Sequence, residues 1–271
     1  MAGTALRGST VLITGGGSGI GRLMALGAAG RGARVVIWDL DRAAGERVRD
    51  RIRSLGGSAH AFEVNVADRE QVREAAAATL AVVDRVDVLV NNAGVVTGKP
   101  LLEATEEQIA RTFDVNVLAL YWVTRAFLPG MIARRRGTVV TIASAAGLLG
   151  VARQTDYSAS KHAAVGFDES LRAELRADRT GVRTLVVCPY YIDTGMFAGV
   201  RTRFPLLLPI LQPTRVAVHI LDAIERGRAR LLLPPFVRLL PVTRVLPVRA
   251  FDALADFLGV NRSMSQFTGR R

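Results

Sequence analysis

The order in which strand-like and helix-like segments alternate is the feature that most constrains this chain. Short apolar runs rich in β-branched residues recur through the first two-thirds of the sequence, and amphipathic stretches separate them. Near-continuous apolar strands suit a parallel sheet that is covered on both faces. The alternation predicts an α/β fold with a doubly wound parallel sheet, whose ligands bind at the carboxyl ends of the strands. The expected strands are residues 11–14, 34–38, 59–64, 86–90, 137–142 and 183–187, and two of the expected helices are Ala104–Leu128 and Ser158–Asp178.

The last quarter of the chain has a different pattern. A length of 271 residues fits one well-buried domain, so we expect residues 196–271 to form a lid and C-terminal extension of the domain that residues 1–195 build. Two proline- and leucine-rich segments there cannot form long helices, and a helix is expected between them, from Pro213 to Arg226. One interpretation of the extension is a cover that packs on the main domain. The other, which is compatible with the first, is an apolar entrance whose arginines rest on a membrane surface.

The net charge of +12 is carried almost wholly by arginine. Basic and acidic residues mix through the first two-thirds of the chain, as on a solvated surface, and the excess of arginine concentrates toward the C-terminus. A basic balance can indicate nucleic acid or anionic lipid as a partner. Because no aromatic residues interleave with the arginines to stack on bases, we expect no nucleic-acid partner.

The single cysteine, Cys188, excludes an intrachain disulfide and fits a reducing compartment. The N-terminus lacks the apolar core of a signal peptide, and we expect no apolar run long enough to span a membrane. These features predict a cytoplasmic protein, or one that is peripheral to a membrane. The three histidines, His60, His162 and His219, are not spaced as metal ligands, so no metal is predicted.

A glycine-rich turn joins the first expected strand to the first helix. Glycines between Thr14 and Gly21 permit a tight turn and a close approach of a pyrophosphate to the helix N-terminus. A glycine-rich stretch alone is often only a loop, but its position between a strand and a helix predicts a dinucleotide site. The contacts expected there come from Gly15, Gly17, Ser18, Gly19, Ile20 and Gly21.

Asp39 closes the second expected strand, about 20 residues after the turn, where a carboxylate can accept hydrogen bonds from ribose hydroxyls. The same carboxylate would repel a 2′-phosphate, and no basic residue stands at Gly17 or Ser18 to attract one. The sequence therefore predicts NAD in preference to NADP. The alternative is that Asp39 is a turn residue without a role in binding.

Tyr157 and Lys161 lie four residues apart, so on a helix they project from the same face. A free tyrosine has a pKa of about 10 and is a poor base at neutral pH. A cation held beside the phenol favours the phenolate and makes proton transfer feasible. Because the same spacing also occurs on exposed helix faces, this pair depends on the surrounding motifs for its interpretation.

Five separated motifs stand in a specific order: the glycine turn, Asn91–Gly94, Asn116, Ser144 and the Tyr157/Lys161 pair. Together they resemble the short-chain dehydrogenase/reductase family over roughly residues 8–195. The resemblance implies a seven-stranded Rossmann-type sheet and an enzyme that acts on CH–OH groups with NAD or NADP. It makes residues 1–195 the dinucleotide-binding catalytic part, and it implies a homodimer or homotetramer.

The resemblance also implies roles for single residues. Tyr157 would be the general acid/base, and Lys161 would lower its pKa and hold the nicotinamide ribose. Ser144 would orient the substrate oxygen, and Asn116 would hold a water that links Lys161 to a proton relay. Further implied cofactor contacts are Asn65, Val66, Asn92, Ala93, Gly94, Pro189, Ile192 and Thr194.

Two positions depart from the family pattern. Tyr190 stands where glycine usually follows Pro189, which reshapes the wall beside the nicotinamide, and Asn65 replaces an acidic residue, although its amide can still accept from adenine. The segments 190–197 and 263–269 are similar to the branch of retinol and 17β-hydroxysteroid dehydrogenases, which implies a bulky lipophilic substrate. The candidate pocket walls are Val95, Leu148, Leu149, Met196 and Phe197, each of which could equally be ordinary core.

The sequence as a whole predicts an NAD-dependent oxidoreductase that interconverts a lipophilic alcohol and its carbonyl, with Tyr157 as acid/base. The alcohol would be retinoid-, steroid- or long-chain-like. One alternative is an NADPH-dependent ketoreductase, against which Asp39 argues. The other is a non-catalytic, cofactor-binding sensor or scaffold, against which the complete set of Asn116, Ser144, Tyr157 and Lys161 argues.

Overall fold

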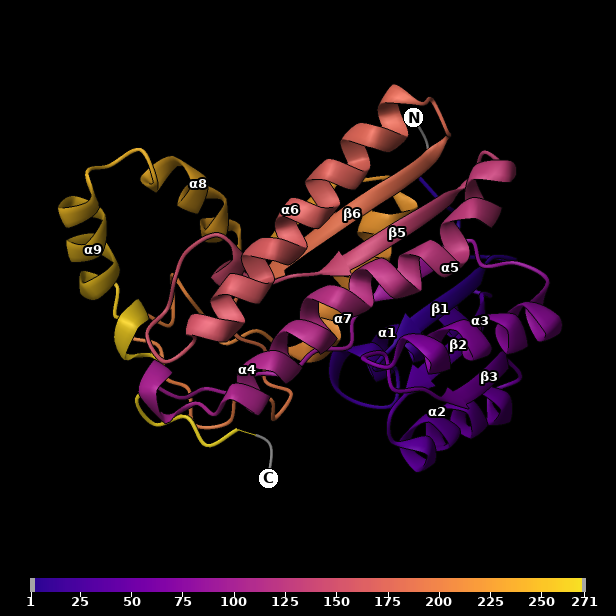
Figure 1. The fold of residues 1–271 in the computed structure, drawn as a ribbon, viewed down its shortest axis with the longest axis horizontal. Helices are drawn as coiled ribbons and strands as arrows, with labels where there is room; N and C mark the ends of the chain where they lie inside the picture. The colour runs from indigo at the N-terminus through magenta and orange to yellow at the C-terminus, as the bar shows by residue number, and fades with distance from the viewer. Residues whose placement is uncertain (1–2, 270–271) are drawn as a thin grey trace.

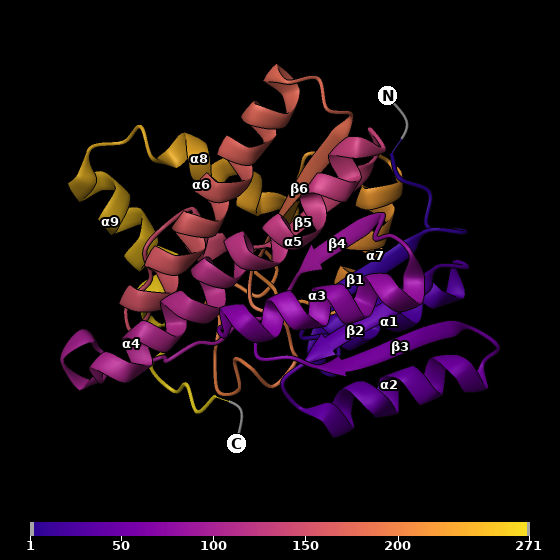
Figure 2. The same ribbon diagram turned by 45° about the vertical axis from the view of Figure 1, so that its right-hand side comes forward.

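A computed structural model describes residues 3–269 as one sheet of seven parallel strands, in the order β3-β2-β1-β4-β5-β6-β7 (Figures 1 and 2). The order reverses between β1 and β4, and the crevice at the carboxyl ends of these strands is where such sheets bind ligands. This confirms the predicted doubly wound, Rossmann-type fold. The strands are β1 (Thr10–Thr14), β2 (Arg34–Asp39), β3 (Ser58–Glu63), β4 (Val88–Asn91), β5 (Gly137–Ile142), β6 (Val182–Pro189) and β7 (Arg230–Leu233).

Helices cover both faces of the sheet (Figure 2). α1 and α7 pack against each other on one face with α2, whereas α3, α5 and α6 contribute side chains to the core on the other face. The helices are α1 (Gly19–Gly30), α2 (Arg42–Ser54), α3 (Arg69–Val83), α4 (Glu106–Phe113), α5 (Ala119–Ala133), α6 (Thr155–Ala177), α7 (Pro213–Glu225), α8 (Leu240–Thr243) and α9 (Val248–Phe257).

The strands read as continuous apolar runs because both of their faces are buried. Every residue of β1 and β5 is buried. Successive side chains of a strand point to opposite faces, so Ile13 and Ile37 join the core beneath α1 and α7, while Leu12 and Val36 join the core beneath α3 and α5. With both faces covered, the ends of the strands are left for ligands.

The seventh strand lies in a segment that the residue pattern alone did not mark as a strand. Arg230–Leu233 pairs in parallel with β6, with Leu232 opposite Cys188. The strand is only four residues long and runs directly into Pro234 and Pro235, so its leucines were read as part of an irregular, proline-rich stretch. The family resemblance had implied seven strands, and that count is confirmed.

The expected helix Ala104–Leu128 is longer and less regular than predicted. α4 continues through a π-helical turn, Asp114–Leu118, into α5, which ends at Ala133. By length and composition the whole run could cross a membrane, a criterion that the sequence had led us to expect no segment to meet. It contacts α3, β4 and β5, and buried helices of soluble proteins meet the same criterion, so we treat it as a core helix.

The chain after residue 195 first adds a helix and a strand to the main body and then forms a separate extension at its side. α7, expected at Pro213–Arg226, and the strand β7 belong to the layers of the sheet, whereas α8 and α9 extend to the side, at the left of Figure 1. The division into residues 1–195 and 196–271 stays a prediction, and its last two residues lie outside the described part of the chain.

Candidate active site

The glycine turn after β1 depends on conformations and contacts that side chains would obstruct. Gly15 has a φ of 63° and Gly19 a φ of 52°, both in the left-handed region that favours glycine. A Cβ atom on Gly21 would lie 2.1 Å from the carbonyl oxygen of Gly15. The glycines therefore let the turn pack closely against the N-terminus of α1, where backbone N–H groups and the helix dipole attract anions, and this cradle fits a pyrophosphate.

Asp39, the last residue of β2, is held against the glycine turn. Its Oδ2 accepts a hydrogen bond from the Gly17 N–H at 2.7 Å, and its Oδ1 accepts one from the Asp41 N–H at 3.0 Å. A Cβ on Gly17 would lie 2.8 Å from the same Oδ2 atom, so glycine is needed for this contact. The carboxylate is half-buried and fixed in direction, with capacity left to accept from hydroxyl groups.

Asn92 and Thr14 join the ends of β4 and β1 across the switch point. Asn92 Nδ2 donates to the carbonyl oxygens of Thr14 at 2.9 Å and Gly15 at 3.1 Å. In return, Thr14 Oγ1 accepts from the backbone N–H groups of Asn92 and Ala93, both at 3.0 Å. The sequence indicated Asn92 but not the role of Thr14, although a threonine that ends a strand directly before a glycine turn could have suggested it.

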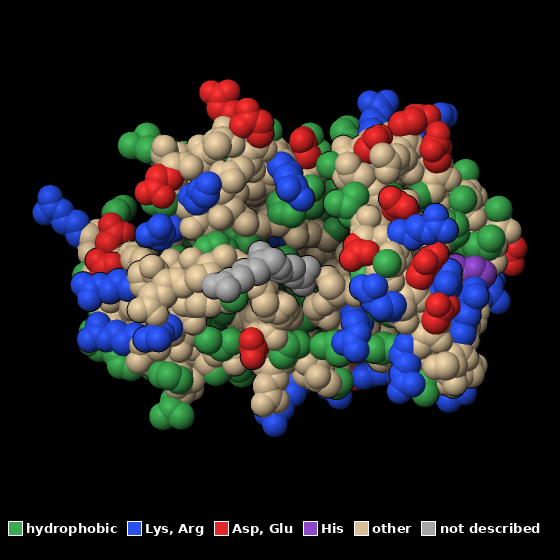
Figure 3. All heavy atoms as spheres, turned by 90° about the horizontal axis from the view of Figure 1, so that it is seen from below, with side chains coloured by type: hydrophobic (Ala, Val, Ile, Leu, Met, Phe, Trp, Pro, Cys, Tyr) green, Lys and Arg blue, Asp and Glu red, His purple; other side chains and the backbone are tan. Residues whose placement is uncertain are grey.

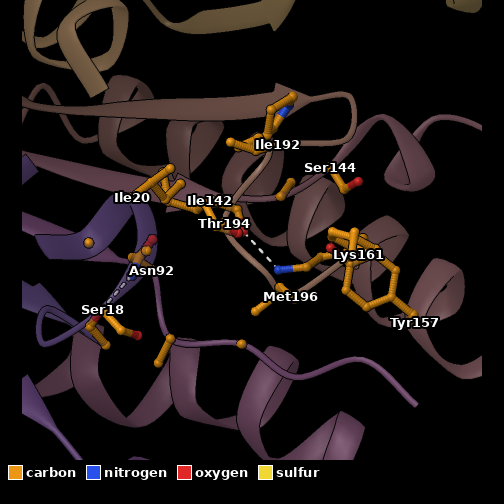
Figure 4. A pocket seen from close by; sticks show the side chains of 18 of the residues that line it. Ser18, Ile20, Asn92, Ile142, Ser144, Tyr157, Lys161, Ile192, Thr194 and Met196 are labelled. Carbon is orange, nitrogen blue, oxygen red and sulfur yellow. Dashed lines mark hydrogen bonds between the residues drawn. The ribbon is translucent and has the colours of Figure 1, made fainter. Parts of the chain in front are cut away.

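A cavity extends from the glycine turn along the carboxyl ends of the strands (Figure 4). Tyr157 and Lys161 from α6 and Ser144, which follows β5, all line it. Tyr157 is 5% exposed and Lys161 is 4% exposed. Lys161 Nζ donates to the backbone oxygen of Ile142 at 2.9 Å and lies 5.6 Å from the centre of the Tyr157 ring. The predicted pair therefore faces one cavity, and the backbone of Ile142, which side-chain patterns cannot reveal, fixes the lysine.

Burial dominates the proton equilibria of this group. It raises the pKa of Tyr157 above its ordinary value, and a hydrogen bond with Ser144 acts in the opposite direction. Burial lowers the pKa of Lys161 to about 8. The expected lowering of the tyrosine pKa by the lysine stays a prediction, because the Lys161 ammonium donates to Ile142 and burial is the main influence on the phenol. The phenol is consequently protonated at neutral pH.

Asn116 lies in the π-helical turn and is 1% exposed, behind the wall of the cavity. Its Oδ1 accepts from the Val95 N–H at 2.8 Å, and its Nδ2 donates to the Val95 oxygen at 2.9 Å and to Ser160 Oγ at 3.0 Å. Ser160 in turn donates to the Tyr157 carbonyl at 2.7 Å. Asn116 therefore positions the chain after β4 against α6, and its role in a water relay stays a prediction.

The predicted residues divide into those that line the cavity and those that support or flank it. The open cavity of about 790 Å³ is lined by Gly15, Ser18, Gly19, Ile20, Gly21, Asn92, Ala93, Gly94, Ser144, Tyr157, Lys161, Pro189, Ile192 and Thr194, together with Ile142, Ala143, Tyr190, Met196 and Phe197. Gly17, Asp39, Asn65, Val66 and Asn116 are not on its wall. The Asn65 Oδ1 accepts from the Ala67 N–H at 3.1 Å, and Val66 is buried.

The candidate pocket walls also divide. Met196 and Phe197 line this cavity, and Leu149 and Phe197 line a second one next to it. Leu148 is buried in the core beside Ala145 and Val165. Val95 lies on a separate surface depression. Ser160 was missed as a supporting residue, although its place inside the Tyr157–Lys161 turn was a signal.

Comparisons with known proteins define the class. A family profile described as short chain dehydrogenase matches residues 9–203. The chain belongs to the short-chain dehydrogenase/reductase family, and it is an NAD(P)-dependent oxidoreductase that acts on CH–OH groups.

Curated relatives match nearly the whole chain. It is 42% identical over 267 residues to epidermal retinol dehydrogenase 2 of Mus musculus, covering 97% of this chain and 86% of the relative. It is 41% identical over 255 residues to estradiol 17-beta-dehydrogenase 11 of Mus musculus, with coverage of 93% and 85%. Retinol dehydrogenase 10 of Xenopus tropicalis is 38% identical over 293 aligned positions, with coverage of 97% and 86%.

Solved structures give the same fold with either cofactor. A short-chain dehydrogenase/reductase from Burkholderia phymatum, in complex with NAD, is 30% identical with a TM-score of 0.81, covering 93% of this chain and 96% of that one. A metagenomic short-chain oxidoreductase in complex with NADP is 31% identical with a TM-score of 0.71, covering 85% and 98%.

The close packing of Gly21 under the turn can be tested by Gly21→Ala. Its Cβ would displace the Gly15 carbonyl and the Asn92 amide, so we expect a loss of about 1–3 kcal/mol in the free energy of unfolding and weaker binding of NADH. Denaturant unfolding and calorimetric titration with NADH measure the two effects.

Gly30→Ala is the matched control, because it lies in the same helix and its Cβ would meet no atom within 4 Å. We expect it to be neutral or to stabilise the protein by up to about 1 kcal/mol. Equal behaviour of the two variants would contradict the role assigned to Gly21.

Proposed function

We propose that this protein is an NAD-dependent dehydrogenase/reductase of lipophilic alcohols and their carbonyls. The observation that carries the proposal is a second cavity that adjoins the first and shares Ser144, Tyr190 and Phe197 with it. Its other walls are mostly apolar, so a ligand there gains by burying hydrocarbon beside the reactive group. The names of the retinol and estradiol dehydrogenases among the relatives support a substrate of this kind.

The residues of the chain have distinct tasks in this reaction. The glycine turn, Asp39, Asn92 and Lys161 would hold the dinucleotide, whose nicotinamide supplies the hydride acceptor in oxidation or the hydride donor in reduction. Ser144 donates a hydrogen bond to the substrate oxygen and stabilises charge that develops on it. The Tyr157 phenol gives a proton to that oxygen in reduction and takes it back in oxidation. The Lys161 ammonium, close to the ring, favours the phenolate that remains.

The function is tested first by Tyr157→Phe. Loss of the only proposed acid/base should lower turnover of a lipophilic alcohol by about a hundredfold to ten-thousandfold, while NADH binding persists. Tyr121→Phe, on the exposed side of α5, is the control and should keep full activity. Turnover by Tyr157→Phe at the rate of the unaltered protein would refute the mechanism.

The same experiment has a pH dependence with a definite sign. Burial raises the pKa of Tyr157, so the neutral phenol predominates at pH 7 and is ready to act as an acid. We therefore expect kcat/KM for alcohol oxidation to rise with pH from neutral to alkaline values, and kcat/KM for carbonyl reduction to stay level around neutral pH and to fall only at strongly alkaline pH. Oxidation that slows as pH rises would contradict this assignment.

The preference for NAD rests on Asp39. A fixed carboxylate at the glycine turn accepts from ribose hydroxyls and repels a 2′-phosphate. In Asp39→Ala we expect NADH to bind roughly tenfold to a hundredfold more weakly, while NADPH binding is unchanged or improved; calorimetric titration with both cofactors measures this. Glu63→Ala, at the exposed end of the adjacent strand, should leave the ratio unaltered. Unchanged selectivity in Asp39→Ala would refute this role and leave Asp39 as a turn residue.

We also propose that the C-terminal extension contacts a membrane surface. Exposed apolar side chains of the extension stand beside exposed arginines at the end of the molecule where α8 and α9 lie, and Figure 3 shows such a mixture at its left-hand end. Apolar groups enter the interface of a bilayer, and arginines attract anionic lipid. The patch consists of Leu239, Val242, Val245, Leu246 and Val248 with Arg238, Arg244 and Arg249.

Sedimentation with vesicles that contain phosphatidylserine tests this contact. We expect the protein to sediment with them, and the variant Val242→Ser/Val245→Ser/Val248→Ser to remain in solution. The control Leu55→Ser/Leu80→Ser alters exposed apolar residues elsewhere and should still sediment. If all three proteins behave alike, the extension is only a cover for the pocket.

A further inference from the structure

One residue on the wall of the second cavity carries a buried polar atom whose hydrogen-bonding capacity is unused. Gln154, the residue that precedes α6, is 1% exposed and lies on the cavity wall among side chains such as Leu149, Val151 and Leu258. Its Oε1 atom is buried and has no hydrogen-bond partner. Among the described residues, Thr141 and Asp168 also have an unpartnered buried oxygen, but neither lines this cavity.

A directional chain of hydrogen bonds fixes which end of the Gln154 amide is unpaired. Ser263 donates its only hydroxyl proton to the Val260 carbonyl at 2.6 Å. In its 2.8 Å bond with Tyr191 Oη, Ser263 Oγ is therefore the acceptor and the phenol the donor. The phenol oxygen can then only accept from Gln154, whose Nε2 lies 3.4 Å away. This order places the amide nitrogen toward Tyr191 and leaves Oε1 as the unpaired atom.

An unpaired buried acceptor costs free energy, and a ligand that supplies a donor recovers it. A carbonyl or ether oxygen at this place would face another acceptor and gain nothing. A charged amine would have to give up its hydration in an apolar cavity, which is costly. A neutral hydroxyl meets the requirement.

We propose that Gln154 is a specificity-determining residue that accepts a hydrogen bond from a second hydroxyl of the substrate. The preferred substrate is then a lipophilic alcohol with two hydroxyl groups, one that reacts near Ser144 and Tyr157 and one that binds to Gln154 Oε1. This inference rests on the proposed oxidation of lipophilic alcohols. It adds to that function a recognition element that an apolar pocket alone does not provide.

The test compares each diol with a mono-alcohol of the same skeleton: androstanediol with the matching androstane mono-alcohol, and decanediol with decanol. In any pair that the unaltered protein oxidises, we expect kcat/KM to be higher for the diol than for the mono-alcohol. Gln154→Met keeps the volume and removes the acceptor, so it should lower kcat/KM for that diol about tenfold to a hundredfold. The mono-alcohol should change by less than about threefold, since it makes no bond to the amide.

Tyr191→Phe is the second variant, because it removes the phenol that orients the amide while it keeps Oε1. We expect it to lower the diol preference less than Gln154→Met does. Unfolding curves and NADH titration verify that both variants are folded.

The outcomes separate this inference from the function on which it rests. If the unaltered protein oxidises none of the four alcohols, the proposed function fails and the inference fails with it. If mono-alcohols are oxidised but Gln154→Met leaves the diol ratio unchanged, the function stands and the inference is overturned, as it would be if a buried water satisfied Oε1. An equal loss for both members of a pair would also overturn it, since it would indicate a general distortion of the pocket.

Discussion

Burial of both faces of a parallel sheet is the constraint on which the rest of this structure depends. Helices cover the faces and neighbouring strands pair with one another, so the ends of the strands remain for chemistry. All strands run in one direction, so one edge gathers the groups that follow their last residues. Thr14, Asp39, Asn92, Ser144 and Pro189 all lie at this edge, although up to 175 positions separate the first from the last.

The same burial sets the electrostatics of the site. Removal from water opposes the charged form of both Tyr157 and Lys161, which moves the pKa of the phenol up and that of the ammonium down. Compensation comes from short, local contacts: Ser144 for the phenol and the Ile142 carbonyl for the ammonium. The pKa values of Tyr157 and Lys161 therefore depend on residues at the end of β5 as well as on their position in α6.

Features of the fold and the site could be predicted from local sequence where backbone geometry or chemistry requires one residue type. The glycine turn, Asp39 and the Tyr157/Lys161 spacing were predictable for that reason, and so was the alternation that gives the sheet. The strand β7 was hidden because four residues before two prolines show no periodicity. Asn116, which was expected to act through a water, lies behind Gly94 and not on the cavity wall, because long-range packing decides which residues reach a cavity.

Long-range contacts also decide how the C-terminal extension relates to the site. Phe197 stacks edge-on against Tyr157, with ring centres 5.7 Å apart, and its other neighbours include Phe267 at 6.4 Å. Ser263 bonds to Tyr191, whose ring is also 5.1 Å from that of Phe197. Residues from the last ten described positions thus support the side chains that enclose Tyr157. The fit of this segment against the main body is therefore part of the packing around Tyr157, although the two lie far apart in the sequence.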